Sequence, residues 1–371
     1  MRILLINYEY PPIGAGAANA TFHLAKELHA LGNEVVVLTA GFESRLGYES
    51  ENGVHVYRLA SRRKKISSSG IFEMLSYVLH ARKELRKVIN QHKIEKAIIF
   101  FSIPCGFLGP YLKRKYGIPY LISLRGGDVP GMEKGINFIH LLIAPWRRRI
   151  LRNASAIIAN SKGLAAASEK ADPYQVEVIP NGVDTEFFRP IERQESDEFV
   201  FLFVGRFQPQ KNLIVLLNAF ANISTNKNIR LKLVGDGPQK NELIYCCRSL
   251  SIEDKVEFLP WQNKEGLLRL YQSADVLLNY SLYEGMPNVV LEAMACGLPI
   301  IASQIMGHEE LVEEGLSGFL VELDDFQNLV LKMEVLLSDN PLRKMMMIKS
   351  RVKIEIYSWL SVAERYLAAF N

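Results

Sequence analysis

Residues 3–38 decide the fold class, and they read ILLINYEYPPIGAGAANATFHLAKELHALGNEVVVL. The apolar run 3–7 is typical of a buried strand, and the β-branched run 34–38 is typical of a second one. Between them, residues 21–31 repeat apolar side chains at helical spacing, and the following Gly32 is a helix stop signal. A strand, a helix and a second strand in this order predict a parallel sheet wound with helices.

The same alternation continues to the end of the chain and occurs twice. Further strands are expected at 54–59, 97–101, 120–124, 156–159 and 176–179, and then at 199–204, 231–234, 256–259, 276–278, 299–302 and 318–321. The polar stretch 192–198 between the two sets has the composition of an interdomain linker. We therefore predict an α/β protein with two Rossmann-like, doubly wound domains, residues 1–190 and 191–355, which face a central cleft. Its chemistry is expected in loops beyond the carboxyl ends of the strands.

The composition is that of a globular protein. Apolar residues make up 49% and charged residues 23%, which excludes a disordered or collagen-like chain. The first residues lack the long apolar stretch of a signal peptide, and prolines and glycines interrupt the longest apolar stretch, 97–112. Four cysteines without a C-x-x-C spacing predict neither a disulfide framework nor a zinc site. We expect a cytoplasmic protein without a transmembrane helix.

Charge is distributed unevenly along the chain. Residues 1–190 hold 26 Lys or Arg against 16 Asp or Glu, whereas the remaining residues hold 18 against 24. This asymmetry indicates an anionic partner, either nucleic acid or a bilayer. No aromatic residues are interleaved with the basic cluster at 62–65, so no nucleic acid is expected. The amphipathic segment 71–89 would either face a membrane or simply pack on the core, and we predict peripheral contact with the inner face of an anionic membrane.

A glycine-rich loop, residues 11–19, joins the first strand to the first helix. Gly14 and Gly16 match part of a dinucleotide-binding fingerprint, but its third glycine and the acidic residue after the second strand are missing. A dehydrogenase is therefore not expected. Small residues at a helix start would let a phosphate or a sugar approach backbone amides, and the alternative is a connection that binds nothing.

A second loop, residues 123–131, follows another expected strand and holds Arg125 and Asp128 among three glycines. A rigid, open loop at a carboxyl edge favours a functional role for this pair. The alternative is an ordinary turn with a surface ion pair.

The second domain opens with a loop that places Gly205, Arg206 and Lys211 after a strand. An Arg fork and a Lys point charge suit a diphosphate, and the alternative is a solvated basic loop.

The segment 283–299 carries Glu284 and Gly285 in a turn and Glu292 inside a short apolar helix. A carboxylate in such a helix is costly unless it is paired, so Glu292 is expected to meet the hydroxyls of a ligand or else to bond neighbouring amides. The amides of residues 285–289, at the positive end of the helix, are suited to a phosphate.

Several separate motifs together resemble a known family. They are PPIGAG at 11–16, IPNGVD at 179–184, VGRFQPQKN at 204–212, GDGP at 235–238, and Glu284 with seven residues before Glu292. The similarity spans nearly the whole chain and points to retaining, nucleotide-sugar-dependent glycosyltransferases of the GT-B fold, in glycosyltransferase family 4. Residues 357–359, Tyr-Ser-Trp, resemble the terminal motif of that family. This implies an acceptor-binding first domain, a donor-binding second domain, and a C-terminal helix in 356–371 that crosses back onto the first.

The resemblance also implies residue roles. Glu284, Arg206 and Lys211 would be catalytic: the two cations would hold the donor diphosphate, and Glu284 would hold the donor sugar. Glu292 would hold the ribose hydroxyls. Smaller contributions to donor binding would come from Gly14, Gly16, Gly205 and Gly285, and from the amides of Met286, Asn288 and Val289. Many relatives carry His where this chain carries Arg125, so Arg125 or Asp128 is the candidate for that sugar or acceptor contact.

The implied reaction uses no metal and no cofactor, with a UDP-sugar favoured over a GDP-sugar as donor. Attack would occur on the face of the leaving group, and the departing phosphate would accept the acceptor's proton. The acceptor would be a glycan or a lipid-linked molecule in cell-envelope polysaccharide or glycolipid synthesis. The alternatives are a non-catalytic sugar-binding homologue, or a GT-B epimerase or phosphorylase.

Overall fold

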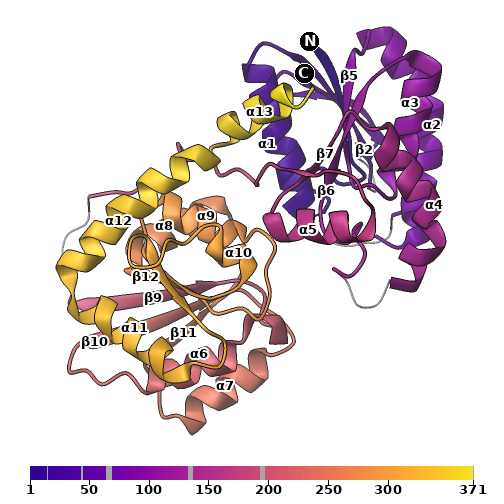
Figure 1. The fold of residues 1–371 in the computed structure, drawn as a ribbon. Helices are drawn as coiled ribbons and strands as arrows, with labels where there is room; N and C mark the ends of the chain where they lie inside the picture. The colour runs from indigo at the N-terminus through magenta and orange to yellow at the C-terminus, as the bar shows by residue number, and fades with distance from the viewer. Residues whose placement is uncertain (15, 43–44, 64–68, 133–136, 193–196, 371) are drawn as a thin grey trace. The chain divides into compact units, whose positions relative to one another are not determined.

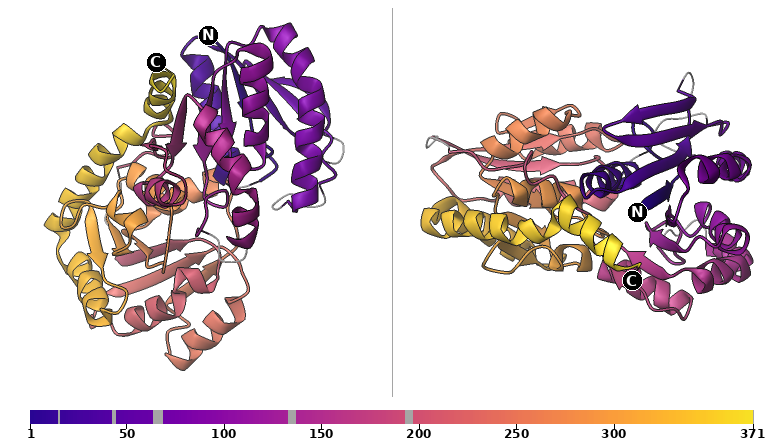
Figure 2. Two further views of the ribbon diagram at one scale, coloured as in Figure 1. Left: turned by 45° about the vertical axis from the view of Figure 1, so that its right-hand side comes forward. Right: turned by 90° about the horizontal axis from the view of Figure 1, so that it is seen from above.

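The computed structural model describes residues 1–370 except 15, 43–44, 64–68, 133–136 and 193–196. The chain forms two compact units, Met1–Gly182 together with Trp359–Asn371, and Val183–Ser358 (Figure 1). Each unit has its own sheet, with helices on both faces (Figure 2). The predicted fold class, two doubly wound α/β domains, is therefore confirmed.

The boundary between the units differs from the one predicted near residue 190. Val183 and Phe188 are buried in a core of the second unit. The Val183 amide also donates to the carbonyl of Tyr357, 2.8 Å away. Residues 183–190 therefore belong to the second unit, and the chain returns to the first unit at Trp359 rather than at residue 356. Apolar packing decides this boundary, whereas the prediction relied on the polar stretch that comes after it.

The first unit is built on an eight-stranded sheet. In sheet order, its strands are β3 (Gly47–Glu51), β4 (Val54–Leu59), β2 (Glu34–Ala40), β1 (Arg2–Ile6), β5 (Lys96–Phe100), β6 (Tyr120–Leu124), β7 (Ala156–Ala159) and β8 (Glu177–Val178). Only β3 pairs antiparallel, with β4. The sequence does not predict β3, because its residues are all exposed and show no apolar alternation.

Helices cover both faces of this sheet. On one face lie α1 (Gly16–Ala30) and α13 (Trp359–Ala368), side by side (Figure 1). On the other face lie α2 (Ile71–His92), the short η1 (Cys105–Leu108), α3 (Gly109–Tyr116), α4 (Asn137–Asn153) and α5 (Lys162–Ala171). Buried Trp359, Val362 and Tyr366 fix α13 to this unit, because they share one apolar core with residues of α1 and of the sheet.

The second unit has a six-stranded, fully parallel sheet. In sheet order, its strands are β11 (Val256–Leu259), β10 (Asn228–Val234), β9 (Glu198–Val204), β12 (Val276–Asn279), β13 (Ile300–Ser303) and β14 (Gly318–Val321). One face is covered mainly by α6 (Leu213–Ala221), α7 (Lys240–Ser249) and α11 (Phe326–Ser338). The other is covered by α8 (Lys264–Ser273) and α9 (Asn288–Ala295). The remaining elements are η2 (Pro209–Lys211), α10 (Met306–Glu309), α12 (Asn340–Ile354) and η3 (Glu355–Tyr357).

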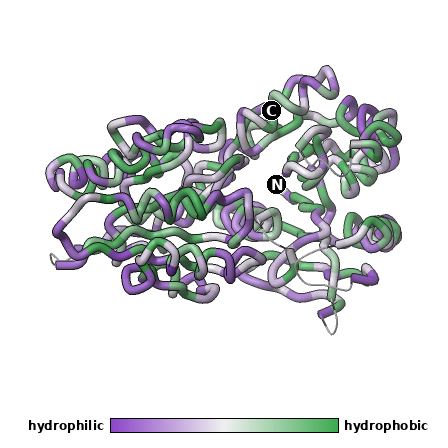
Figure 3. Tube along the Cα trace, turned by 90° about the horizontal axis from the view of Figure 1, so that it is seen from below, coloured by the Kyte–Doolittle hydropathy of each residue, from purple (hydrophilic) through white to green (hydrophobic). Residues whose placement is uncertain are grey.

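Both sheets change their direction of winding once. In the first unit this point lies between β1 and β5, and in the second it lies between β9 and β12. Hydrophobic and hydrophilic segments alternate along the chain (Figure 3), and the strands of both sheets carry buried apolar residues. None of the helices in the described part of the chain is long and apolar enough to cross a membrane.

Candidate functional site

The residues predicted for the second domain gather where its sheet changes direction. The loop with Arg206 and Lys211 follows β9, and the loop with Glu284 follows β12, its neighbour in the sheet. The helices after these loops, α6 and α9, pack on opposite faces of the sheet. Loops that diverge at such a point form the usual ligand-binding place of a doubly wound sheet.

Three glycines let two loops of this edge touch backbone to backbone. Gly235 has a φ of +142°, and a Cβ atom on it would lie 2.0 Å from the Gly205 carbonyl oxygen. A Cβ atom on Gly237 would lie 2.3 Å from the carbonyl oxygen of Phe207. The Phe207 amide in turn donates to Asp236 at 2.9 Å. Gly235 and Gly237 therefore have a packing reason to be glycine, and a Cβ atom on Gly205 would lie 2.9 Å from the Phe203 ring.

Lys211 and Glu284 form an ion pair between the two loops. Their side chains are 13% and 10% exposed, so both remain accessible although most of each is covered. Ser281 donates a second hydrogen bond to the same Glu284 oxygen, at 2.8 Å. The Gln210 side chain ties the loops further by donating to the Tyr283 carbonyl at 2.7 Å. The pair is thus held rigidly, with a cation ready for phosphate oxygens and a carboxylate ready for hydroxyl groups.

Arg206 differs from Lys211 in being exposed. Within the described residues its guanidinium makes no ion pair with a carboxylate. A cation at this edge that no protein carboxylate neutralises is suited to an anionic ligand.

His308 lies beneath the Glu284 loop and was not predicted. A Cβ atom on the preceding Gly307 would lie 2.7 Å from the Glu284 carbonyl oxygen, so α10 begins against that loop. The His308 Nδ1 is 2.9 Å from the carbonyl of Ser303, whose hydroxyl donates to the Ser281 carbonyl at 2.5 Å. Burial lowers the pKa of His308, so the ring is neutral, and its Nε2 has no hydrogen-bond partner among the described residues. The sequence signal that would have pointed to it is the Gly307-His308 pair in the segment that follows β13.

Glu292 sits in the middle of α9, as predicted, and has a hydroxyl partner. The Tyr271 hydroxyl, from α8, donates to its Oε2 at 2.9 Å. The carboxyl remains partly exposed, yet desolvation raises its pKa to about 7, against the opposing effects of the Tyr271 bond and of Lys264. A carboxyl that is half ionised near neutral pH gains from any ligand hydroxyl that donates to it. Sequence spacing alone does not reveal Tyr271, because α8 and α9 are brought together only by the sheet.

The first turn of α9 carries the other predicted donor contacts. Pro287 caps the helix, and Asn288 and Val289 are partly exposed. Nothing lies within 4 Å of the position where Gly285 would carry a Cβ atom, so a ligand can approach its backbone. The Met286 side chain is buried in the core at 8% exposure, which leaves only its backbone for the predicted contact.

In the first unit, Gly14 and Gly16 follow β1 at the corresponding point of the sheet. Gly14 has a φ of +94°, and a Cβ atom there would lie 2.6 Å from a carboxylate oxygen of Glu9. Gly16 is the exposed first residue of α1. The Asn7 side chain anchors this helix start by donating to the Thr21 hydroxyl at 2.7 Å. Gly14 is therefore packed closely against Glu9, and Gly16 lies at the positive end of α1.

Arg125 turns toward the interior of the first unit. Its guanidinium donates to Asn181 at 2.8 Å and to the Tyr366 hydroxyl at 3.2 Å, and lies 4.4 Å from the ring centre of Phe100. Burial lowers the pKa of this guanidinium. These contacts favour a bracing role, in which Arg125 ties the loop after β6 to helix α13.

Asp128 is the organiser of the same loop. Only 2% of it is exposed, and its carboxylate accepts the amides of Ser102 at 2.6 Å, Arg125 at 2.9 Å and Gly126 at 3.1 Å. A carboxylate surrounded by backbone donors shapes a loop rather than offering oxygens to a ligand. The contact of Arg125 or Asp128 with a sugar or acceptor stays a prediction.

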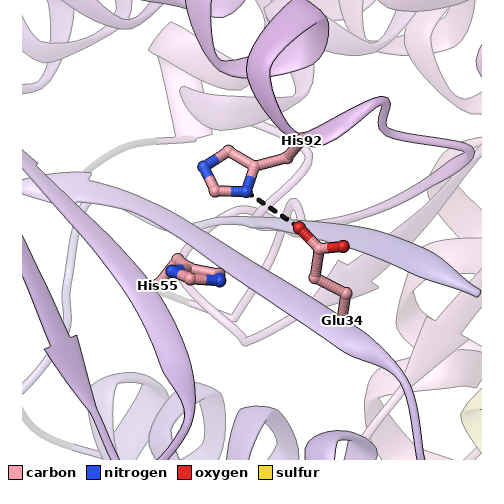
Figure 4. A group of neighbouring side chains, drawn as sticks. All are labelled: Glu34, His55 and His92. Atoms are coloured by element: carbon pink, nitrogen blue, oxygen red, sulfur yellow. Dashed lines mark hydrogen bonds and ion pairs between the residues drawn. The ribbon is translucent and has the colours of Figure 1, made fainter.

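One group in the described part of the chain has the side chains to hold a metal ion. Ligand atoms of Glu34, His55 and His92 lie within 4.8 Å of one another (Figure 4). His92 is already bonded through both ring nitrogens, to Glu34 at 2.9 Å and to the Tyr57 hydroxyl at 2.8 Å. Glu34 begins β2, so the group lies at the amino edge of the sheet, opposite the loops described above. It has no part in the candidate site.

Two families match the sequence. The one described as "Glycosyltransferase Family 4" matches residues 14–187, and the one described as "Glycosyl transferases group 1" matches residues 184–353. The two matches adjoin near the observed boundary between the units.

Individual proteins agree with these families. An uncharacterised glycosyltransferase of Methanocaldococcus jannaschii is 29% identical over 100% of this chain and 98% of its own length. UDP-Gal:alpha-D-GlcNAc-diphosphoundecaprenol alpha-1,3-galactosyltransferase of Escherichia coli is 28% identical over 67% of this chain and 69% of its own. The sucrose-phosphate synthase structure from Thermosynechococcus elongatus superposes with a TM-score of 0.82 at 22% identity, covering 100% of this chain and 98% of that one. The chain is a glycosyltransferase of the GT-B fold and belongs to glycosyltransferase family 4.

Proposed function

We propose that this glycosyltransferase moves a hexose from a UDP-sugar to a glycan or lipid-linked acceptor, with retention of the anomeric configuration and without a metal ion. The observation that carries the proposal is the Lys211–Glu284 ion pair beside exposed Arg206. Two cations and one rigidly held carboxylate meet where the second sheet changes direction.

The cations supply what a metal would otherwise supply. When the bond from sugar to diphosphate breaks, negative charge grows on the departing phosphate. Lys211 and the exposed Arg206 of the same loop would donate to this charge, and the positive end of α9 would add to their field. Lys211 is already held in place by its ion pair with Glu284.

Glu284 is suited to holding the donor sugar rather than to acting as a base. Its carboxylate is paired with Lys211 and accepts from Ser281, so both contacts hold it in place. In the proposed reaction the acceptor oxygen attacks the anomeric carbon from the side of the leaving group. The bond to the phosphate oxygen breaks, and that oxygen takes the acceptor's proton.

Glu292 is suited to the ribose of the donor. Its partly exposed carboxyl, with a pKa near 7, would become ionised when ribose hydroxyls donate to it. The preference for uracil and for a lipid-linked acceptor is supported by the Escherichia coli relative, whose name gives UDP-Gal as donor and a diphosphoundecaprenol as acceptor. Such an acceptor would place the protein in the cytoplasm, at the inner face of the membrane, in envelope polysaccharide or glycolipid synthesis.

A non-catalytic homologue or an epimerase is the competing function. A homologue that only binds sugars has no need for Arg206, Lys211 and Glu284 together, and this chain has all three, with Lys211 and Glu284 paired. This favours transfer.

Donor binding tests the proposal. Purified protein is titrated with UDP-, GDP- and ADP-sugars in EDTA, and its melting temperature is followed. The expected result is a rise with UDP-sugars that Lys211→Ala and Glu292→Ala abolish. Lys255→Ala, an exposed lysine at the opposite edge of the same sheet, is the matched control and should respond like the wild type. A rise that requires added metal, or no rise with any nucleotide sugar, contradicts the proposal.

A further inference from the structure

Two helices of the first unit expose large apolar side chains. On α2 these are Ile71, Phe72, Leu75 and Leu79, of which Phe72 is 87% and Leu79 63% exposed. On α4 they are Phe138, Ile139, Leu141, Leu142 and Trp146, of which Phe138 is 72% and Leu141 71% exposed. Both helices belong to the same face of the sheet (Figure 1), and both contact η1, the short helix that leads into α3. An apolar surface of this kind needs a partner.

The exposed side chains form stripes that end at arginines. On α2, Phe72, Leu75 and Leu79 follow helical spacing and lead to Arg82, three residues further on. On α4, Phe138, Leu142 and Trp146 do the same and lead to Arg149.

Arg82 and Arg149 meet in a hollow of about 530 Å³. It is lined by Arg82 of α2, by Tyr111, Arg114 and Lys115 of α3, and by Trp146 and Arg149 of α4, among others, and none of the described residues that line it is Asp or Glu. Arg82 lies 4.8 Å and Lys115 5.3 Å from the ring centre of Tyr111. Among the described residues, no carboxylate forms an ion pair with Arg82, Arg114 or Arg149. The hollow therefore combines unneutralised cations with aromatic walls.

The surrounding charge has the same sign. Helices α2, α3 and α4 carry four, three and four Lys or Arg, against two Glu on α2 and no other acidic residue. Of these cations, only Arg147 and Arg148 have a carboxylate partner in the described part of the chain, the buried Asp172. A positive field of this extent is complementary to an anionic surface.

We propose that this face of the first unit docks on an anionic lipid bilayer, with a lipid phosphate in the hollow and the two apolar stripes in the acyl boundary. The inference extends the proposed function, since a lipid-linked acceptor would lie in that bilayer. Apolar stripes beside a basic hollow are the pattern of a helix pair lying in a membrane interface. Nucleic acid would leave the aliphatic side chains of both stripes in water, so it is the less favoured partner.

Vesicle flotation tests the docking. Vesicles of phosphatidylglycerol mixed with phosphatidylcholine should capture the wild type, and vesicles of phosphatidylcholine alone should not. Arg82→Gln with Arg149→Gln should weaken capture about thirtyfold, because each cation near an anionic surface contributes about 1 kcal/mol. Phe72→Ser with Leu79→Ser should weaken it at least about tenfold through lost apolar insertion.

Matched controls come from the second unit. Tyr245, 73% exposed, and Arg248, also exposed, lie on α7, and Tyr245→Ser with Arg248→Gln should leave capture unchanged. Trp146 is a direct probe, since it is 56% exposed in the hollow and its fluorescence should shift to the blue on anionic vesicles. Trp146→Phe should lose that shift.

The donor-induced rise in melting temperature is measured on every variant. A normal rise with lost capture separates the docking face from the donor site and shows that the variant is folded. Equal capture of the wild type and the paired variants overturns the proposal, as does equal capture by both kinds of vesicle. Binding of an RNA oligonucleotide that the arginine variants abolish, without capture by vesicles, replaces the bilayer by nucleic acid and also overturns it. Failure of the donor titration alone affects only the proposed function.

Discussion

Asp128 and Glu284 follow strands at the carboxyl edges of the two sheets, yet their surroundings differ. Asp128 is 2% exposed and bonded to three backbone amides of its own unit. Glu284 is bonded to two side chains, Lys211 and Ser281, and its side chain keeps 10% exposure. A carboxylate that accepts backbone amides stabilises the loop conformation. A carboxylate that is bonded only to side chains can replace one of these contacts by a contact with a ligand.

The arginines of the two loops differ in the same way. Arg125 bonds Asn181 and Tyr366 inside the first unit, while Arg206 is exposed. The two sheets have the same topology but differ at their carboxyl edges. We call the edge at Asp128 and Arg125 closed, because both side chains bond inside the unit, and the edge at Glu284 and Arg206 open, because both side chains remain accessible. Strand order places both edges, and the partners of the polar side chains decide which one is ready for chemistry.

The largest expected effect comes from removing the cation of the open edge. Lys211→Ala should lower kcat about 10²- to 10³-fold, because one fixed donor to the leaving-group charge is lost. The measurement is the initial rate of nucleoside diphosphate release from the donor identified by binding. Lys255→Ala, at the far edge of the sheet, should keep the wild-type rate. If the rate of Lys211→Ala were within about twofold of the wild-type rate, Lys211 would not stabilise the leaving group, and the open edge would have no catalytic role through it.

At the closed edge, Asp128→Asn should act on stability. An amide in place of the carboxylate leaves at least one of the three backbone donors facing an NH2 group, which costs about 3 kcal/mol of unfolding free energy. Urea unfolding measures this loss. The donor-induced thermal shift, which depends on the second unit, should persist. A stable Asp128→Asn protein that fails to transfer sugar would instead place Asp128 in the reaction.

Glu292 is expected to affect both stability and donor binding, and the pH dependence of unfolding tests its effect on stability. Its pKa of about 7 in the folded protein exceeds the ordinary value of 4.5, so the folded state holds more protons than the unfolded state between these values. Stability therefore falls as the pH rises from about 4.5 to 7, and then levels off. Glu292→Gln removes this loss, and it should be more stable than the wild type at pH 8, by about 2 kcal/mol, but not at pH 4.5.

Urea unfolding of Glu292→Gln and wild type at both pH values measures the difference. The same variant should lose affinity for the donor, because an amide is a weaker acceptor for hydroxyls. A stability difference that does not change with pH would mean that Glu292 titrates like an exposed carboxyl.

The smallest effect is expected at the contact between Arg125 and α13. Tyr366→Phe removes the hydroxyl that accepts from Arg125 and bonds Ser123 at 2.7 Å, which should cost about 1 kcal/mol. Thermal unfolding measures the loss, and sugar transfer should be unchanged. Leu360→Ala, at an exposed position of the same helix, is the control and should be close to neutral. A variant whose rate falls with its stability intact would give Arg125 a role beyond bracing.

The amino-acid sequence alone predicts the two doubly wound units and the loops that carry the candidate site residues. Apolar periodicity and glycine stops are local signals, and they place every strand except the polar edge strand β3. Lys211, Glu284 and Glu292 stand out for the same reason, since a charged residue next to a glycine turn or inside an apolar helix is visible without a fold.

Only the tertiary structure decided what those residues touch. Tyr271 reaches Glu292 from another helix, Lys211 reaches Glu284 across 73 positions of sequence, and Arg125 reaches Tyr366 across 241. It also moved the boundary to residue 183, because the apolar side chains there enter the core of the second unit. A side chain's partner depends on which strands become neighbours. The order of the strands is set by the burial of the whole sheet, and not by the residues that flank a given side chain in the sequence.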